Sequence, residues 1–139
     1  MLALTLVVGI VNVTAVQVAR IRLYDVADAA ALDAADAVRD AELYATGVRG
    51  GLPLTDEAVH ESVARYLAAT PLPANVSAWR LERAGVRAPA DALPGAAPAA
   101  EVSLTGTVDL PLGGGLLAGL AGPVTLTVSS TADPRTAPS

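Results

Sequence analysis

The sequence predicts an α+β fold: a long hydrophobic N-terminal helix continues into a small domain with a second helix and an antiparallel sheet of about three strands. Three observations lead to this prediction. The first nineteen residues carry no charge, and from Arg20 no proline or glycine follows until Gly47. A later stretch, between Thr55 and Pro71, has apolar residues at helical spacing. Two segments, 101–110 and 124–130, alternate apolar and polar residues as half-buried strands do.

The composition limits the classes of protein to consider. The 139 residues suffice for one small domain with a hydrophobic anchor, and they are 53% hydrophobic and 17% charged. The nine basic residues are all arginine, the net charge is −5, and cysteine is absent. Without lysine or cysteine there is no Walker lysine, Schiff base, thiolate nucleophile, zinc finger or iron–sulfur cluster. An acidic chain without a basic tract also binds nucleic acid poorly, because that affinity rests on neutralising phosphates.

Residues 1–19 predict a helix for an apolar environment, since a helix of this length spans about 28 Å, close to a bilayer core. A secretory signal would begin with a basic region, which this segment lacks, and the helical pattern continues past Arg20. We therefore expect a retained helix. The residues expected to contact membrane or neighbouring subunits are Leu2, Leu4, Thr5, Leu6, Val7, Val8, Ile10, Val11, Val13, Val16 and Val18.

The same helix is expected to run to about residue 46, so that 1–46 forms one hydrophobic-to-amphipathic helix and then the spine of the domain. Arg20 and Arg22 mark the junction between its two halves. Small residues recur on one side and predict close helix–helix packing at Ala30, Ala34, Ala37 and Ala41. Aspartates at 25, 33, 36 and 40 share an arc of about 80°, which indicates a solvated or intersubunit acidic face.

Residues 47–131 are expected to form the small α+β domain, followed by a flexible tail at 132–139. Thr55 is the expected N-cap of the second helix, whose apolar stripe is Val59, Val63, Tyr66 and Leu67. Pro71 and Pro73 end that helix. The remaining assignments are a linker at 47–53, strands at 76–82, 101–110 and 124–130, a loop at 87–100 and a flexible apolar connector at 113–122.

No set of residues predicts catalysis, a cofactor or a metal. The five aspartates between 25 and 40 lie along a helix, whereas calcium ligands alternate along an irregular loop. His60 is the only histidine and fits an ordinary helix surface. Trp79 is expected in the core rather than as a ligand-stacking residue. The triplet that begins at Asn75 fits a glycosylation sequon. The three glycines from Gly113 are not followed by the Gly-Lys-Ser/Thr sequence of a phosphate-binding loop.

A family resemblance comes from the N-terminal half. An uncharged helix, the basic step Ala19-Arg20-Ile21-Arg22-Leu23 and the run DAAALDAADA at 28–37 resemble TadE/TadG-like proteins of the tight-adherence (Flp) branch of type IV pilus systems. The resemblance rests on specific residues over 1–46. In the later strands it consists only of the alternation of apolar residues with Thr and Ser. It implies a pilin-like subunit whose hydrophobic helix resides in the bacterial membrane and then in a surface filament. Its implied partners are other subunits, forming a homo-oligomeric filament, and an inner-membrane assembly platform with its motor.

Two features keep a second interpretation open. Pilins of this kind carry a glutamate where this sequence has Thr5, and no leader peptide precedes Met1 in the sequence. A membrane-anchored TadE/TadG-like accessory protein that never polymerises therefore remains the alternative. Arg20 and Arg22 favour a cytoplasmic domain by the positive-inside tendency. The strands rich in Thr and Ser resemble an exported domain, and we expect the domain outside.

Overall fold

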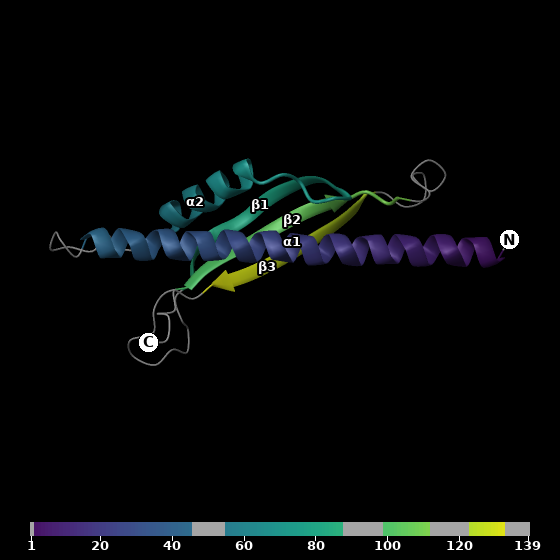
Figure 1. Cartoon of the computed structure of the whole chain (residues 1–139), viewed down its shortest axis with the longest axis horizontal. Coiled ribbons are helices and arrows are strands. Elements are labelled where there is room, and N and C mark those ends of the chain that lie inside the picture. Colours follow the sequence, from purple (N-terminus) through teal and green to yellow (C-terminus); the bar gives the residue numbers. More distant parts are fainter. Residues whose placement is uncertain (1, 46–54, 88–98, 112–122, 133–139) are drawn as a thin grey trace, which may run out of the picture.

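The structure is a computed structural model that describes residues 2–45, 55–87, 99–111 and 123–132, without the side chains of 38–45. It consists of helices α1 (Leu2–Ala45) and α2 (Asp56–Ala69) and strands β1 (Val76–Arg87), β2 (Ala99–Val108) and β3 (Val124–Ala132). The predicted α+β layout is confirmed: a long helix, a shorter helix and three antiparallel strands (Figure 1).

The strands form one sheet in the order β1-β2-β3, with both neighbouring pairs antiparallel. The β2–β3 register is regular from Ala100 opposite Ala132 to Val108 opposite Val124. Irregularities interrupt the β1–β2 ladder between Val76 and Ala78 and again after Leu81. Because side chains alternate across a strand, this register places the apolar residues of β2 on one face and its Ser and Thr on the other.

Both helices cover the same face of the sheet (Figure 1). α1 packs across β2 and β3, and α2 packs on β1 and beside α1. The core lies between these two layers, and its largest fully buried side chains are Leu23, Leu104, Val59, Val63, Val102, Val108 and Val128. The opposite face of the sheet is polar, and hydroxyls pair across it, as in the hydrogen bond between Thr105 and Thr127 (3.1 Å).

α2 begins and ends as the sequence predicts. The Thr55 side chain accepts a hydrogen bond from the Ala58 N–H (3.3 Å), which caps the first turn. Val59, Val63 and Leu67 are buried on one side of α2. The helix ends at Ala69, shortly before two prolines that cannot continue it.

Three predicted boundaries need correction. β1 extends to Arg87 and β2 already begins at Ala99, so the expected loop is shorter than 87–100. Pairing with the neighbouring strand extends each strand beyond its alternating segment, which local sequence does not reveal. Ala132 is a buried residue of β3 rather than the first residue of a tail, because it pairs with Ala100. The expected linker 47–53, the connector 113–122 and residues 133–139 lie outside the described residues.

Candidate functional site

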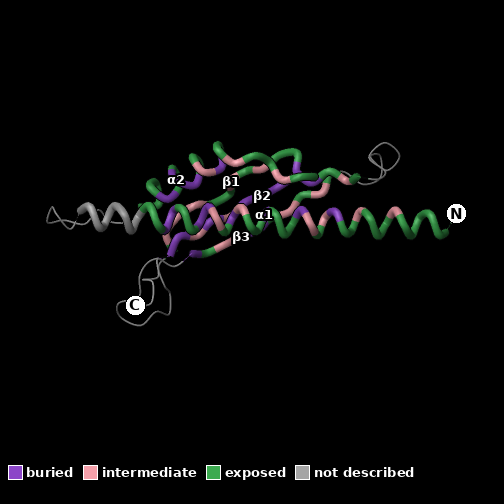
Figure 2. The backbone as a smooth tube through the Cα atoms, viewed as in Figure 1, coloured by how far each residue is buried: buried purple, intermediate pink, exposed green. Residues whose placement is uncertain are grey.

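The most unusual surface is the free half of α1, which we define as residues 2–14. It projects beyond the sheet, and most of its residues are exposed (Figure 2). Large apolar side chains are exposed on it, including Leu2 at 91%, Leu6 at 66% and Val13 at 62%. Such a run of exposed aliphatic residues is unusual on a monomeric soluble protein and marks a contact with membrane or protein. By length and composition α1 is compatible with a transmembrane helix, although a signal sequence passes the same test.

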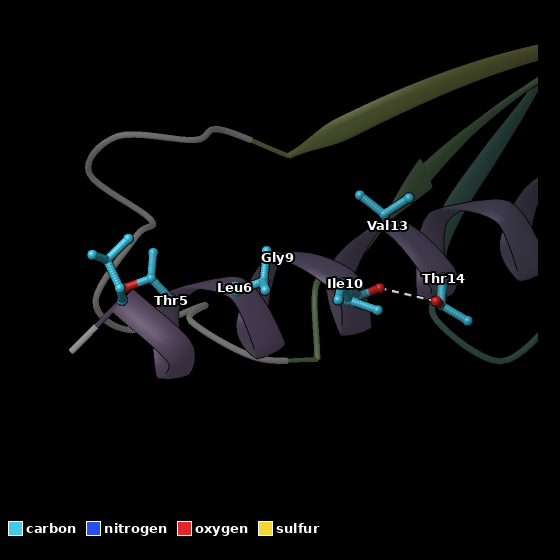
Figure 3. Close-up of a pocket in the computed structure, with 7 residues that line it drawn as sticks. Thr5, Leu6, Gly9, Ile10, Val13 and Thr14 are labelled. Atoms are coloured by element: carbon cyan, nitrogen blue, oxygen red, sulfur yellow. Dashed lines mark hydrogen bonds between the residues drawn. The ribbon is translucent and has the colours of Figure 1, made fainter.

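An open hollow of about 500 Å³ follows one side of the free half (Figure 3). Gly9 lies in its middle, and a Cβ added there would meet nothing within 4 Å. The hollow is otherwise lined by Leu2, Thr5, Leu6, Ile10, Val13 and Thr14. A helix surface that combines a glycine with aliphatic side chains allows a second helix to approach closely.

One polar group of the free half is satisfied by the helix itself. The Thr14 hydroxyl donates to the Ile10 carbonyl oxygen (2.9 Å), four residues earlier (Figure 3). A hydroxyl paired in this way can enter an apolar environment without the full cost of burying an unpaired polar group. Thr14 is therefore compatible with lipid as well as with a neighbouring subunit.

The second half of α1 belongs to the domain core. A buried stripe begins at Ala15 and continues through Ala19, Leu23, Ala27, Ala30, Ala31, Ala34 and Ala35. Of the alanines predicted for helix–helix packing, Ala30 and Ala34 are fully buried within this chain.

Four other predicted residues of α1, two alanines and two valines, are not part of the buried stripe that the structure describes. Ala37 is exposed in this chain, and its packing against a neighbouring helix stays a prediction. The side chain of Ala41 is outside the described residues. Val16, predicted among the membrane or assembly residues, is half-buried and packs against the domain core, and Val18 is also half-buried.

The junction residues Arg20 and Arg22 are both exposed. The Arg20 guanidinium lies over the ring of Tyr24, 5.8 Å from its centroid, a weak cation–π contact at an exposed site. These arginines are the first charges along α1, so they separate its uncharged part from the part that carries aspartates.

Two aspartates of α1, Asp33 of the predicted acidic face and Asp28 outside its arc, connect α1 to other elements. Asp33 accepts a hydrogen bond from the Ser62 hydroxyl of α2 (3.1 Å), and Asp28 accepts one from Ser130 of β3 (2.7 Å). Asp25 and Asp36 are exposed. The sequence showed the acidic arc but not these pairings, because a serine partner 29 or 102 residues away leaves no local signal.

The other candidate residues have ordinary surroundings. His60 is exposed on α2, and its neighbour Glu61 pairs with Arg65 (3.1 Å). Trp79 is half-buried against the core. Among residues 2–45, 55–87, 99–111 and 123–132, no group of three His, Cys, Asp or Glu side chains is placed to hold a metal ion.

No protein-family model, curated protein or solved structure matches this chain. The functional interpretation therefore rests on the chain's own residues and geometry.

Proposed function

We propose that the chain is a pilin-like structural subunit of a type IV (Tad/Flp-like) pilus, which assembles through the free half of α1 into a surface filament. The observation that carries the proposal is the division of α1. One half exposes aliphatic side chains without any charge, and the other half is the spine of a folded domain. The resemblance of residues 28–37 to TadE/TadG-like proteins supports the same assignment.

The physical argument concerns the fate of the exposed aliphatic surface. Fully burying one Leu, Ile or Val side chain stabilises by about 1.5–3 kcal/mol. With six such side chains more than half exposed on the free half, their burial contributes on the order of 10 kcal/mol. A bilayer and a bundle of apolar helices both provide that burial. One helix therefore serves first in the bacterial membrane and then in the filament core, with other subunits as its partners.

A second candidate is a membrane-anchored TadE/TadG-like accessory protein that does not polymerise. The observation that favours it is the exposed aliphatic surface of the free half, which a membrane anchor alone also accounts for. This protein would share the membrane helix and the domain but remain in the membrane fraction.

Replacing Val7 with arginine tests the proposal. Val7 is 54% exposed, so the substitution leaves the domain core intact. It places a charge in the apolar interface at a cost of several kcal/mol, and we expect sheared filaments to be lost. Filament yield is measured by shearing cells and sedimenting the released material.

The matched control is Val7→Leu, which keeps the surface apolar and should assemble normally. Thermal unfolding of both variants checks that the domain is intact. Normal filament yield from Val7→Arg would show that the free half is not in the filament core.

A further inference from the structure

We propose that the bilayer also contacts the domain itself: the end of the domain beside the free half of α1 enters the boundary between lipid headgroups and acyl chains. We call this surface the proximal end and define it by Pro71, Leu72, Pro73, Leu110 and Pro111. It lies where the α2–β1 connection, the end of β2 and the start of β3 lie close together on one side of α1 (Figure 1). This inference rests on the membrane-resident stage of the proposed function.

The first argument is the overlap between the uncharged part of α1 and the domain. α1 carries no charge before Arg20, but the domain already lies beside it much earlier. Leu110 lines a hollow of about 240 Å³ together with Asn12, Val13, Val16 and Gln17. Residues 12–19 therefore belong both to the uncharged part of α1 and to the part that lies beside the domain. At 1.5 Å per residue they span about 12 Å.

This overlap places the proximal end at membrane depth. If the hydrocarbon boundary falls at the first charge, Arg20, the proximal end lies on the lipid side of that boundary. Surface elements of peripheral and anchored proteins enter the headgroup–acyl boundary by about 5–10 Å, which is comparable with the overlap. A domain held wholly in water would instead pull uncharged turns of α1 out of the membrane.

The second argument is the chemistry of the proximal end. Leu72 is 47% exposed, and Pro71 and Pro111 are exposed as well. Among the described residues, none is charged from 66 to 79, at 110–111 or from 123 to 132. Asp109, the residue before Leu110, is charged, and a single carboxylate is compatible with the hydrated headgroup layer.

The third argument is backbone hydrogen bonding, because lipid does not replace the hydrogen bonds of exposed N–H groups. Pro71, Pro73 and Pro111 have no N–H to satisfy. The Val76 N–H donates to the Pro73 carbonyl (3.1 Å), and the Asp109 N–H donates to the Asn75 carbonyl (2.9 Å). The second bond also ties the two connections of the proximal end together.

The opposite end of the domain, away from the free half of α1, carries charged residues. Asp56 and Glu57 at the start of α2, Arg87 at the end of β1 and Glu101 near the start of β2 place charges there. The domain is therefore polarised along α1, with Asp109 beside the proximal end and several charged residues at the opposite end. A lipid surface at the proximal end accounts for this polarity.

Spin labels test the inference directly, because the chain has no cysteine and accepts a single engineered one. We would label Leu72→Cys, Arg87→Cys and Val7→Cys separately in the full chain. Each is reconstituted into vesicles of phosphatidylethanolamine and phosphatidylglycerol. The readout is the collision rate of the label with oxygen, which concentrates in lipid, relative to a water-soluble nickel complex. All three positions are exposed, and thermal unfolding checks that each labelled chain is folded.

We expect the oxygen-to-nickel ratio at Leu72 to be several-fold higher than at Arg87 and lower than at Val7. Equal ratios at Leu72 and Arg87, with Val7 in the hydrocarbon, would overturn this inference while the membrane helix stands. Water-like ratios at all three positions would overturn the membrane-resident stage of the proposed function and this inference with it.

Discussion

Leu23 and Gly106 meet where α1 crosses the sheet. Leu23 is fully buried, and a Cβ built on Gly106 would lie 2.5 Å from its Cδ1. Real side chains do not approach so closely, so the end of the fully buried Leu23 side chain would have to shift. Gly106 is therefore the position that allows α1 to lie flat on β2. A glycine inside an alternating strand is a sequence signal for such a close approach, whereas its partner is not readable from sequence.

Substituting Gly106 with alanine should destabilise the domain by about 1–3 kcal/mol, because the added methyl overpacks the contact with Leu23. Urea unfolding in detergent micelles measures the loss. Gly9→Ala is the matched control, since a Cβ there meets nothing within 4 Å. Its expected effect is neutral, or stabilising by about 0.5–1 kcal/mol from helix propensity. Unchanged stability of Gly106→Ala would contradict the packing described here.

Ser62 is the one buried polar side chain among the described residues, and its hydroxyl donates to Asp33. Asp33→Ala leaves this hydroxyl unpaired in the core and should cost about 1–3 kcal/mol of unfolding free energy. The double variant Asp33→Ala/Ser62→Ala should recover most of that loss. Asp25→Ala, at an exposed aspartate of the same helix, should change stability by less than about 0.5 kcal/mol. Equal losses of unfolding free energy in Asp33→Ala and Asp25→Ala would contradict a specific hydrogen bond between Asp33 and Ser62.

At the scale of elements, the sequence predicted the two helices closely. α1 was expected to run to about residue 46, and the structure describes it as a helix up to Ala45. α2 has the predicted cap, and Val59, Val63 and Leu67 of its predicted stripe are buried. Their signals are local: apolar spacing, a threonine cap, and prolines after the end. The sequence also predicted where the strands lie, but it did not predict their lengths. Extent and register depend on pairing with distant segments, as in Arg87 opposite Ala99.

α2 is attached to the sheet by a contact that sequence did not reveal. The Asp56 carboxylate accepts a hydrogen bond from the Val86 N–H of β1 (2.7 Å). A side chain at Gly85 would collide with this carboxylate, since an added Cβ lies 2.8 Å from Asp56 Oδ1. The absence of a side chain at Gly85 thus lets the first turn of α2 cover the edge of β1.

Asp56→Ala should therefore loosen the α2–β1 contact. We expect faster hydrogen exchange at the Val86 amide and a loss of about 1–2 kcal/mol, since the donor loses a charged acceptor. Glu57→Gln is the control: Glu57 is exposed in the same helical turn, and its loss of charge changes only the weak interaction with the helix dipole. Unchanged exchange at Val86 in Asp56→Ala would show that the hydrogen bond does not hold α2 in place.

At the scale of the whole molecule, the division of α1 into an uncharged half and a domain-forming half could be predicted from its charge pattern. The residue at which the domain begins to cover α1 could not be predicted from the sequence. Val16 was grouped with the membrane residues but packs against the core. This difference arises because the tertiary fold, and not the helix itself, decides which turns are covered.

The central claim is that the free half of α1 assembles subunits into a filament on the cell surface. Immunogold electron microscopy of sheared surface material, with an antibody against residues 55–139, tests it most directly. We expect gold spaced along thin filaments, with the domain accessible outside the cell. Filaments without gold, and the protein confined to the membrane fraction, would contradict the claim and favour the anchored accessory protein.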